Sequence, residues 1–131
     1  DRIEKLSSIK NTPCVFQEYV SKEVEYRAVY INGQFFVCEI DSQKGKLSKF
    51  DWRAYEYDKV KFSKATLPKE TLQKLAQLAK ARGLAAASFD LAKNSKNQIV
   101  FFEMNRPGAW LFVEALTGLP ITDAAIAWSK G

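Results

Sequence analysis

Alternating apolar and polar positions predict two strands, residues 24–31 and 34–40, joined as a hairpin. Both runs are rich in β-branched and aromatic side chains, which favour strands. The connecting Asn32-Gly33 dipeptide suits a two-residue hairpin turn, because both residues tolerate positive φ angles. Since side chains alternate along a strand, one face of the first strand carries Val24, Tyr26, Ala28 and Tyr30, and the other carries Glu25, Arg27, Val29 and Ile31.

A helical period appears farther along the chain and leads into a second hairpin. Pro68 stands at the expected helix start and Gly83 at its end. The apolar stripe between them consists of Leu72, Leu75, Ala76, Leu78 and Ala79. Residues 85–91 and 99–105 then predict two strands, with a polar turn at residues 94–97.

The chain closes with two predicted helices. Residues 110–116 form the first, which Gly118 ends, and Thr122 is the expected cap of a last helix that runs to about Ser129. This order of elements predicts an α+β fold, an antiparallel sheet with helices packed on one face. No internal repeat or interdomain linker interrupts the sequence, so residues 1–131 are expected to form a single domain.

Four segments carry weaker patterns. Residues 1–12 have a faint helical period that Pro13 ends, and residues 1–13 are expected to be a poorly defined N-terminal segment. Residues 14–20 indicate a short strand or a passage from strand to linker. Residues 46–52 are a candidate third strand, and residues 54–66, polar and aromatic without a clear period, are expected to form a loop.

The strand at residues 99–105 ends in two polar residues that suggest chemistry. Glu103 and Asn105 are two positions apart, so on a strand their side chains leave the same face. A turn centred on Ser95-Lys96 would pair Asp90 with Phe101 and place Asp90 diagonally next to Glu103. Carboxylate and carboxamide oxygens are hard donors that suit Mg²⁺.

The three-residue set depends on register, because a slip of one residue moves Asp90 to the other face. Two carboxylates this close repel each other unless a cation or a proton lies between them. The sequence therefore predicts a metal–phosphate site formed by Asp90, Glu103 and Asn105. A polar, solvated sheet face is the alternative.

Composition narrows the choice of chemistry. The chain has no histidine, which excludes imidazole bases, histidine triads and histidine metal sites within it. A net charge of +5 fits phosphate or nucleic-acid ligands, or simply solvated surface lysines. Cys14 and Cys38 show no metal-type spacing and are expected to be buried free thiols, with a disulfide left open. No apolar run approaches the ~18 residues of a membrane span.

Two arginines supply candidate cations. Arg27 shares a strand face with Glu25, and Arg53 ends the run Asp51-Trp52-Arg53. Either guanidinium can clamp a phosphoryl group or a carboxylate with two hydrogen bonds. The alternative is an ordinary surface ion pair with a neighbouring acidic residue.

The ordered set of motifs resembles a known enzyme family. The motifs are Phe16-Gln17-Glu18-Tyr19-Val20, Glu25-Tyr26-Arg27, Asn32-Gly33, Glu39-Ile40-Asp41-Ser42-Gln43, Asp51-Trp52-Arg53, Leu67-Pro68, Phe89-Asp90-Leu91, and Phe102-Glu103-Met104-Asn105 through Gly108-Ala109-Trp110. In this order they resemble the C-terminal part of ATP-grasp ligases, closest to the RimK-like branch and the microviridin-type (graspetide) peptide ligases. The resemblance runs from about residue 14 to residue 129.

The resemblance implies a nucleotide site. The segment Gln17, Glu18, Tyr19 and Val20 corresponds to the interlobe hinge, whose backbone groups hydrogen-bond the adenine edge. Glu25 corresponds to a position near the ribose hydroxyls. The implied cofactors are ATP and Mg²⁺.

The resemblance also implies the phosphoryl-transfer groups. Arg27 and Arg53 correspond to arginines that face the transferred phosphoryl group and the acyl-phosphate. Asp90, Glu103 and Asn105 correspond to the magnesium ligands, in agreement with the register argument. Phosphoryl transfer depends on positioning and charge neutralisation, so Mg²⁺ and arginines suffice without histidine.

Two departures from the family accompany the resemblance. The family usually has Asn-Pro-Asn-Gly-Gln-Trp where this chain has Asn105-Arg106-Pro107-Gly108-Ala109-Trp110, so Arg106 is expected to add a cation beside the site. The family's two phosphate-binding lysines come from a lobe that would precede residue 14. The chain is therefore expected to be the C-terminal lobe alone, and inactive or nearly so by itself.

The function implied is that of the ATP- and Mg-binding lobe of a cytoplasmic carboxylate ligase. Such a ligase forms an acyl-phosphate and then an amide or ester bond, on a ribosomal peptide or a small-molecule carboxylate. The alternatives are a RimK-like ligase that adds amino acids to a protein tail and a non-catalytic ATP-grasp-like domain that binds nucleotide or peptide. A nucleic-acid-binding domain is disfavoured, because the lysines form no stripe. No nucleic-acid or membrane partner is expected, and a homodimer of the full-length protein is left open.

Overall fold

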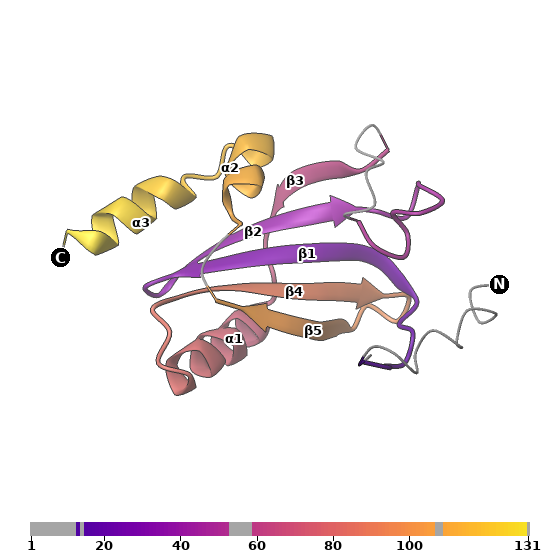
Figure 1. Cartoon of the computed structure of the whole chain (residues 1–131), viewed down its shortest axis with the longest axis horizontal. Helices are drawn as coiled ribbons and strands as arrows, with labels where there is room; N and C mark the ends of the chain where they lie inside the picture. Colours follow the sequence, from indigo (N-terminus) through magenta and orange to yellow (C-terminus); the bar gives the residue numbers. More distant parts are fainter. Residues whose placement is uncertain (1–12, 14, 53–58, 107–108, 131) are drawn as a thin grey trace.

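A five-stranded antiparallel sheet forms the centre of the molecule. The computed structural model describes residues 13, 15–52, 59–106 and 109–130. The strands are β1 (Lys22–Ile31), β2 (Gln34–Asp41), β3 (Lys61–Ala65), β4 (Ala86–Asn94) and β5 (Ile99–Asn105). Their order in the sheet is β3-β2-β1-β4-β5, so β1 is the middle strand (Figure 1).

Three helices accompany the sheet, and they cover both of its faces. They are α1 (Lys69–Ala81), α2 (Leu111–Thr117) and α3 (Ile121–Ser129). Leu75 and Ala79 of α1 pack with Tyr26 and Ala28 of β1 in one apolar cluster. On the opposite face, Val113 of α2 and Ile121 of α3 pack in a second cluster, together with Val29, Ile31, Cys38 and Ile40.

The α+β class and the antiparallel sheet are confirmed, whereas the prediction of helices on one face is wrong. The reason lies in the strands, because β1 is apolar on both faces over residues 28–31. A strand that is apolar on both sides needs a cover on each side. Among the described residues, no helix is long and apolar enough to cross a membrane.

The first hairpin forms as predicted. Asn32 and Gly33 have φ angles of 41° and 95°, which belong to a two-residue turn with both central residues at positive φ. The register pairs Ile31 with Gln34 and Arg27 with Cys38. The alternation of Glu25 and Arg27 against the apolar face of β1 is therefore confirmed.

Two segments between β2 and α1 differ from the prediction. The candidate strand at residues 46–52 is a series of turns, and part of the expected loop at 54–66 is instead the edge strand β3. This strand was not predicted because its sequence, which contains Lys61 and Lys64, has too few apolar residues to show an alternating pattern. Charged side chains of this kind are common on edge strands, where they discourage pairing with other chains. Phe62 of β3 packs against the apolar cluster that contains Val113 of α2 and Ile121 of α3.

The last helix begins differently from the prediction. Pro120, not Thr122, is its N-cap residue, and no side chain of the capping residue bonds the helix. The backbone N–H and the hydroxyl of Thr122 instead both donate to Oε2 of Glu114, at 2.8 and 2.6 Å. A carboxylate of α2 therefore satisfies the first turn of α3.

Candidate nucleotide and metal site

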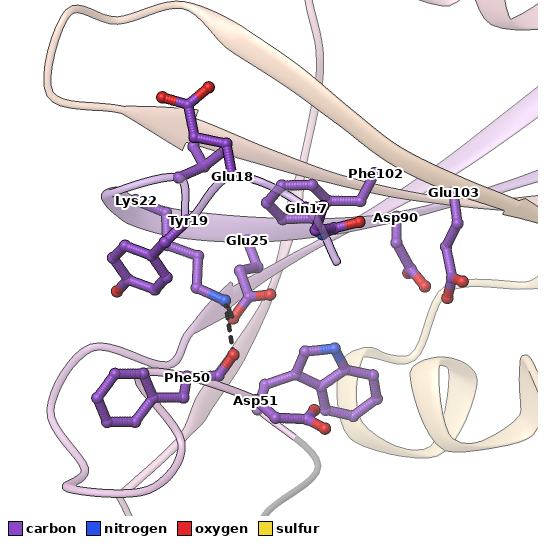
Figure 2. A pocket seen from close by; sticks show the side chains of 12 residues that line it. Gln17, Glu18, Tyr19, Lys22, Glu25, Phe50, Asp51, Asp90, Phe102 and Glu103 are labelled. Atoms are coloured by element: carbon purple, nitrogen blue, oxygen red, sulfur yellow. Dashed lines mark hydrogen bonds and ion pairs between the residues drawn. The ribbon is translucent and has the colours of Figure 1, made fainter. Parts of the chain in front are cut away.

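A cavity of about 360 Å³ lies where the segment before β1, the loop after β2 and strands β4 and β5 meet (Figure 2). Its lining residues are Gln17, Glu18, Tyr19, Val20, Lys22, Glu25, Phe50, Asp51, Trp52, Asp90, Phe102 and Glu103. Seven of the ten sequence-predicted site residues are among them, the four hinge residues included. Its described residues include five carboxylates and one lysine, so this part of the lining is acidic although the whole chain is basic.

Asp90 and Glu103 lie directly opposite each other in the β4–β5 ladder. The predicted pairing of Asp90 with Phe101 is wrong, because Phe101 pairs with Leu91. The hairpin loop is one residue longer than expected, with Asn97 at a left-handed φ of 58°. An irregularity then follows between Asp90 and Leu91 and leaves Phe102 as an extra residue on β5.

These two one-residue deviations cancel in their effect on the side-chain faces. The longer loop alone would have moved Asp90 to the face opposite Glu103. The bulge at Phe102 restores the shared face and brings the two carboxylates from a diagonal to a direct pair. Figure 2 shows both carboxylates directed to the same side of the sheet.

Asn105 completes the predicted oxygen-donor set. Its Nδ2 donates to Oε1 of Glu103 at 3.0 Å, so the two side chains share a face as the spacing predicted. Among the described residues, no group of three or more His, Cys, Asp or Glu side chains lies together as a metal site. The candidate set therefore consists of two carboxylates and one carboxamide.

Arg27 holds Asp90 from the next strand. The two residues are paired in the β1–β4 ladder, and Nη1 of Arg27 donates to both Asp90 oxygens, at 2.8 and 2.9 Å. The Arg27 guanidinium lies 5.8 Å from the centre of the Phe112 ring, and its Nε is buried without a hydrogen-bond partner among the described residues. The guanidinium is thus fixed from two sides and keeps an unused donor.

The donor set fits a divalent cation on charge as well as chemistry. Arg27, Asp90 and Glu103 form a row across three neighbouring strands, and these three described residues alone carry one positive and two negative formal charges. An oxygen-rich site with negative excess is what Mg²⁺ requires, with phosphate oxygens and water as its remaining ligands. Asp90, Glu103 and Asn105 therefore fit the implied metal.

Glu25 is a buried residue that also lines the cavity, two positions before Arg27 on β1. Its Oε1 accepts from Lys22 Nζ at 2.9 Å and from the Ser42 hydroxyl at 2.7 Å. Lys22 also donates to the backbone oxygen of Phe50 at 3.3 Å, and the fully buried Ser48 donates to the Ser42 backbone oxygen at 2.8 Å. These bonds tie the loop after β2 to the start of β1.

Sequence reasoning missed Lys22 and Ser42 as members of the site. Ser42 lies in a recognised motif, but its sequence gives no sign of a contact with a residue seventeen positions earlier. Lys22 stands three residues before Glu25, and on a regular strand side chains three positions apart leave opposite faces, so no contact was expected. The ladder is irregular between Lys22 and Val24, and such irregularity re-aims side chains at strand ends.

The hinge residues enter the cavity lining without forming a strand. The alternative of a short strand at residues 14–20 is wrong for the described part, since residues 15–20 have no regular structure. Val15 and Phe16 are exposed, and the Tyr19 ring lies 6.2 Å from that of Phe50. Backbone groups outside a ladder remain available for a ligand.

The two other arginines of the prediction have different outcomes. Arg53 lies outside the described residues, so its assignment stays a prediction. Arg106 does not lie beside Asp90 and Glu103, where it was expected. It lines a separate groove with Leu78, Leu84 and Met104 on the side of α1, because it follows Asn105 and therefore points the opposite way.

Comparison with solved structures identifies the fold. An ATP-grasp ligase from Chryseobacterium gregarium, associated with ribosomal peptide (RiPP) modification and solved with ADP and a leader and core peptide, is 24% identical with a TM-score of 0.82. The alignment covers 95% of this chain and 38% of that ligase. No protein-family model matches the chain, and neither does any curated protein sequence.

Two further solved structures agree. The macrocyclase MdnB from Microcystis aeruginosa is 30% identical over 84% of this chain and 38% of its own, with a TM-score of 0.67. The ATP-grasp ligase PsnB, solved with a precursor variant, Mg and ADP, is 16% identical over 96% of this chain and 39% of its own, with a TM-score of 0.71. The chain therefore has the fold of one part of an ATP-grasp ligase, which confirms the resemblance inferred from its motifs.

Proposed function

We propose that this chain is the nucleotide- and magnesium-binding part of an ATP-grasp ligase that joins a carboxylate of a peptide to an amine or a hydroxyl. The observation that carries the proposal is the row Arg27, Asp90, Glu103 on three neighbouring strands, with Asn105 bonded to its end. Asp90 and Glu103 of this row line a cavity that the hinge segment, residues 17–20, also lines. The likeness to ligases solved with ADP, Mg and precursor peptides supports the substrate class.

Each group then has a role in binding. The backbone of residues 17–20 binds the adenine edge, and Glu25, held by Lys22 and Ser42, faces the ribose hydroxyls. Asp90, Glu103 and Asn105 would hold Mg²⁺, which would supply charge neutralisation for the phosphate oxygens. Arg27, held against Asp90, is the cation assigned to the transferred phosphoryl group. Arg53 is assigned the same task on the strength of the resemblance alone.

The reaction needs no acid or base from histidine. A substrate carboxylate oxygen attacks the γ-phosphorus, the bond to the β–γ bridging oxygen breaks, and ADP leaves with the electron pair. The amine or hydroxyl then attacks the acyl carbon, its proton passes to solvent, and phosphate leaves with the electron pair of the broken bond to the acyl carbon. Both steps spread negative charge over oxygens. Arg27, together with the cation that Asp90, Glu103 and Asn105 would hold, would stabilise that charge more in the transition state than in the ground state.

Replacement of one metal ligand tests the proposal. In the full-length protein that carries this chain, Glu103→Gln removes one negative charge from the metal site and is expected to lower the release of ADP and phosphate, with a peptide carboxylate as substrate, by at least about 100-fold. Arg106→Gln is the matched control directly after the same strand, because Arg106 lines the groove on the α1 side. Its turnover should equal that of the wild type.

The outcomes separate the candidate functions. Full turnover by Glu103→Gln would refute the metal-ligand role of Glu103. Tight binding of ATP by the wild type without any release of ADP would instead identify a non-catalytic nucleotide-binding domain. Turnover with free amino acids and a protein tail, but not with a peptide carboxylate, would favour the RimK-like alternative.

A further inference from the structure

Ser88 carries a buried hydroxyl that the described structure does not use. The residue lies in β4, two positions before Asp90, and is fully buried. Its Oγ has no hydrogen-bond partner among the described residues. A buried hydroxyl without a partner costs free energy that an alanine of nearly the same size would avoid. The neighbouring Ala86 and Ala87 show that this part of β4 accepts alanine.

The register places this hydroxyl next to the candidate metal site. Ser88 is paired with Asn105 in the β4–β5 ladder, directly after the pair of Asp90 with Glu103. Directly opposed residues of an antiparallel pair have their Cβ atoms about 4.5–5.5 Å apart on one face. On its other side Ser88 is paired with Val29, which cannot form a hydrogen bond through its side chain.

The carboxamide of Asn105 faces a conflict once a cation is bound. In the present structure its Nδ2 donates to Oε1 of Glu103. A cation between the two residues needs an oxygen from each, so Asn105 must turn its Oδ1 toward Glu103 and its Nδ2 away. The amide N–H groups then require a new acceptor at a site that is only partly exposed.

We propose that Ser88 is a positioning residue whose Oγ accepts a hydrogen bond from Nδ2 of Asn105 when the metal site is loaded. This inference rests on the proposed function. The hydroxyl does not contact the metal or the nucleotide; it selects the orientation of the carboxamide that presents oxygen to the cation. Groups that orient metal ligands in this way contribute to affinity although they bind no metal themselves.

The test measures metal binding without turnover. Mn²⁺ is the probe, titrated into the full-length protein in the presence of ADP, and the free ion is followed by electron paramagnetic resonance. Ser88→Ala is expected to weaken Mn²⁺ binding about 10-fold. Its thermal unfolding midpoint without metal should be equal to or above that of the wild type, since the variant loses an unsatisfied hydroxyl.

Two further variants separate positioning from a general structural role. Ser88→Thr keeps the hydroxyl and should restore Mn²⁺ affinity to within about 3-fold of the wild type. In an Asn105→Ala background, Ser88→Ala should cause no further loss, because the group that it orients is gone. This second comparison stands even if the threonine variant does not fold.

Each result supports or overturns the inference. Wild-type Mn²⁺ affinity in Ser88→Ala, or an equal loss in the Asn105→Ala background, would overturn the role of Ser88 and leave the proposed function intact. A wild-type protein that binds no Mn²⁺ with ADP would overturn the proposed function, and this role with it.

Discussion

At the scale of single residues, the sheet face that α2 and α3 cover changes from apolar to charged along β1. Its inner half is apolar, at Val29 and Ile31, whereas Arg27 and Glu25 toward the other end are charged and nonetheless buried. Buried charges are tolerated only when they are paired and hydrogen-bonded. Arg27 forms an ion pair with Asp90. Glu25 forms an ion pair with Lys22 and accepts a hydrogen bond from Ser42. The charged half of the face is therefore ordered before any ligand arrives.

Cys38 is expected to make the free energy of unfolding depend on pH in the alkaline range. Burial raises the pKa of its thiol from 9.0 to about 11. Between these values the unfolded chain has released the proton and the folded chain still holds it, so the free energy of unfolding falls as pH rises through this window. Urea unfolding at pH 8, 9, 10 and 11 should record full stability at pH 8 and a progressive loss above pH 9.

Cys38→Ala is the control for this pH dependence. The variant should lose part of the slope between pH 9 and pH 11. The remainder belongs partly to Tyr26, since burial and the nearby carboxylate of Glu39 raise the pKa of that phenol to about 12. An unchanged slope in Cys38→Ala would contradict the assignment of this titration to Cys38.

At the scale of elements, turns decide which side chains meet. The Asn32-Gly33 turn sets the register that brings Arg27 and Glu25 to their places in β1. The longer loop after β4 and the bulge at Phe102 do the same for the carboxylate pair. In both hairpins the site depends on backbone angles that few residues adopt, because a one-residue slip would turn the functional side chains to the other face.

Replacement of Gly33 in the first hairpin turn is expected to destabilise the protein. Its φ angle is 95°, where an L-residue other than glycine is strained, although open space surrounds the position of the missing Cβ. Gly33→Ala should lower the free energy of unfolding by about 1–2 kcal/mol. Chemical denaturation measures the change. Gly33→Asn is the matched variant, because asparagine tolerates left-handed angles, and it should lose clearly less. Equal losses in the two variants would argue that the backbone angle is not the cause.

At the scale of the whole molecule, charge is distributed unevenly. The chain has a net charge of +5, yet the described residues of the cavity lining include five carboxylates and one lysine, which is already paired with Glu25. A nucleotide polyphosphate would meet like charge there. The described part of the lining therefore favours cations, and phosphate oxygens are expected to bind there more tightly together with a divalent cation.

The molecule-scale prediction follows from this distribution. ADP should bind the full-length protein at least about 100-fold more weakly in EDTA than with Mg²⁺, because the acidic row then repels the phosphates. Isothermal titration calorimetry measures both affinities. Adenosine, which has no phosphate, is the control, and its affinity should not depend on EDTA. ADP binding that is equally tight with and without the metal would contradict the role of the row.

The strands, helices and donor residues were accessible to sequence reasoning where local signals are strong. The Asn-Gly turn, the stripe of α1 and the spacing of Glu103 and Asn105 all act over a few residues, and all three were predicted correctly. Edge strand β3 was not, because its lysines remove the apolar alternation. The hydrogen bonds of Lys22 and Ser42 to Glu25 were not predicted either, since they depend on how a loop folds back.

The sequence by itself determined that Asp90, Glu103 and Asn105 are oxygen donors on a hairpin, because residue chemistry and strand alternation are local properties. Only the tertiary structure decided that Asp90 faces Glu103 directly and is held by Arg27. That arrangement depends on a loop length, a bulge and the pairing of β1 with β4 across more than sixty residues. The same pairing set Ser88 against Asn105, because register between distant strands is decided by the packing of the whole sheet.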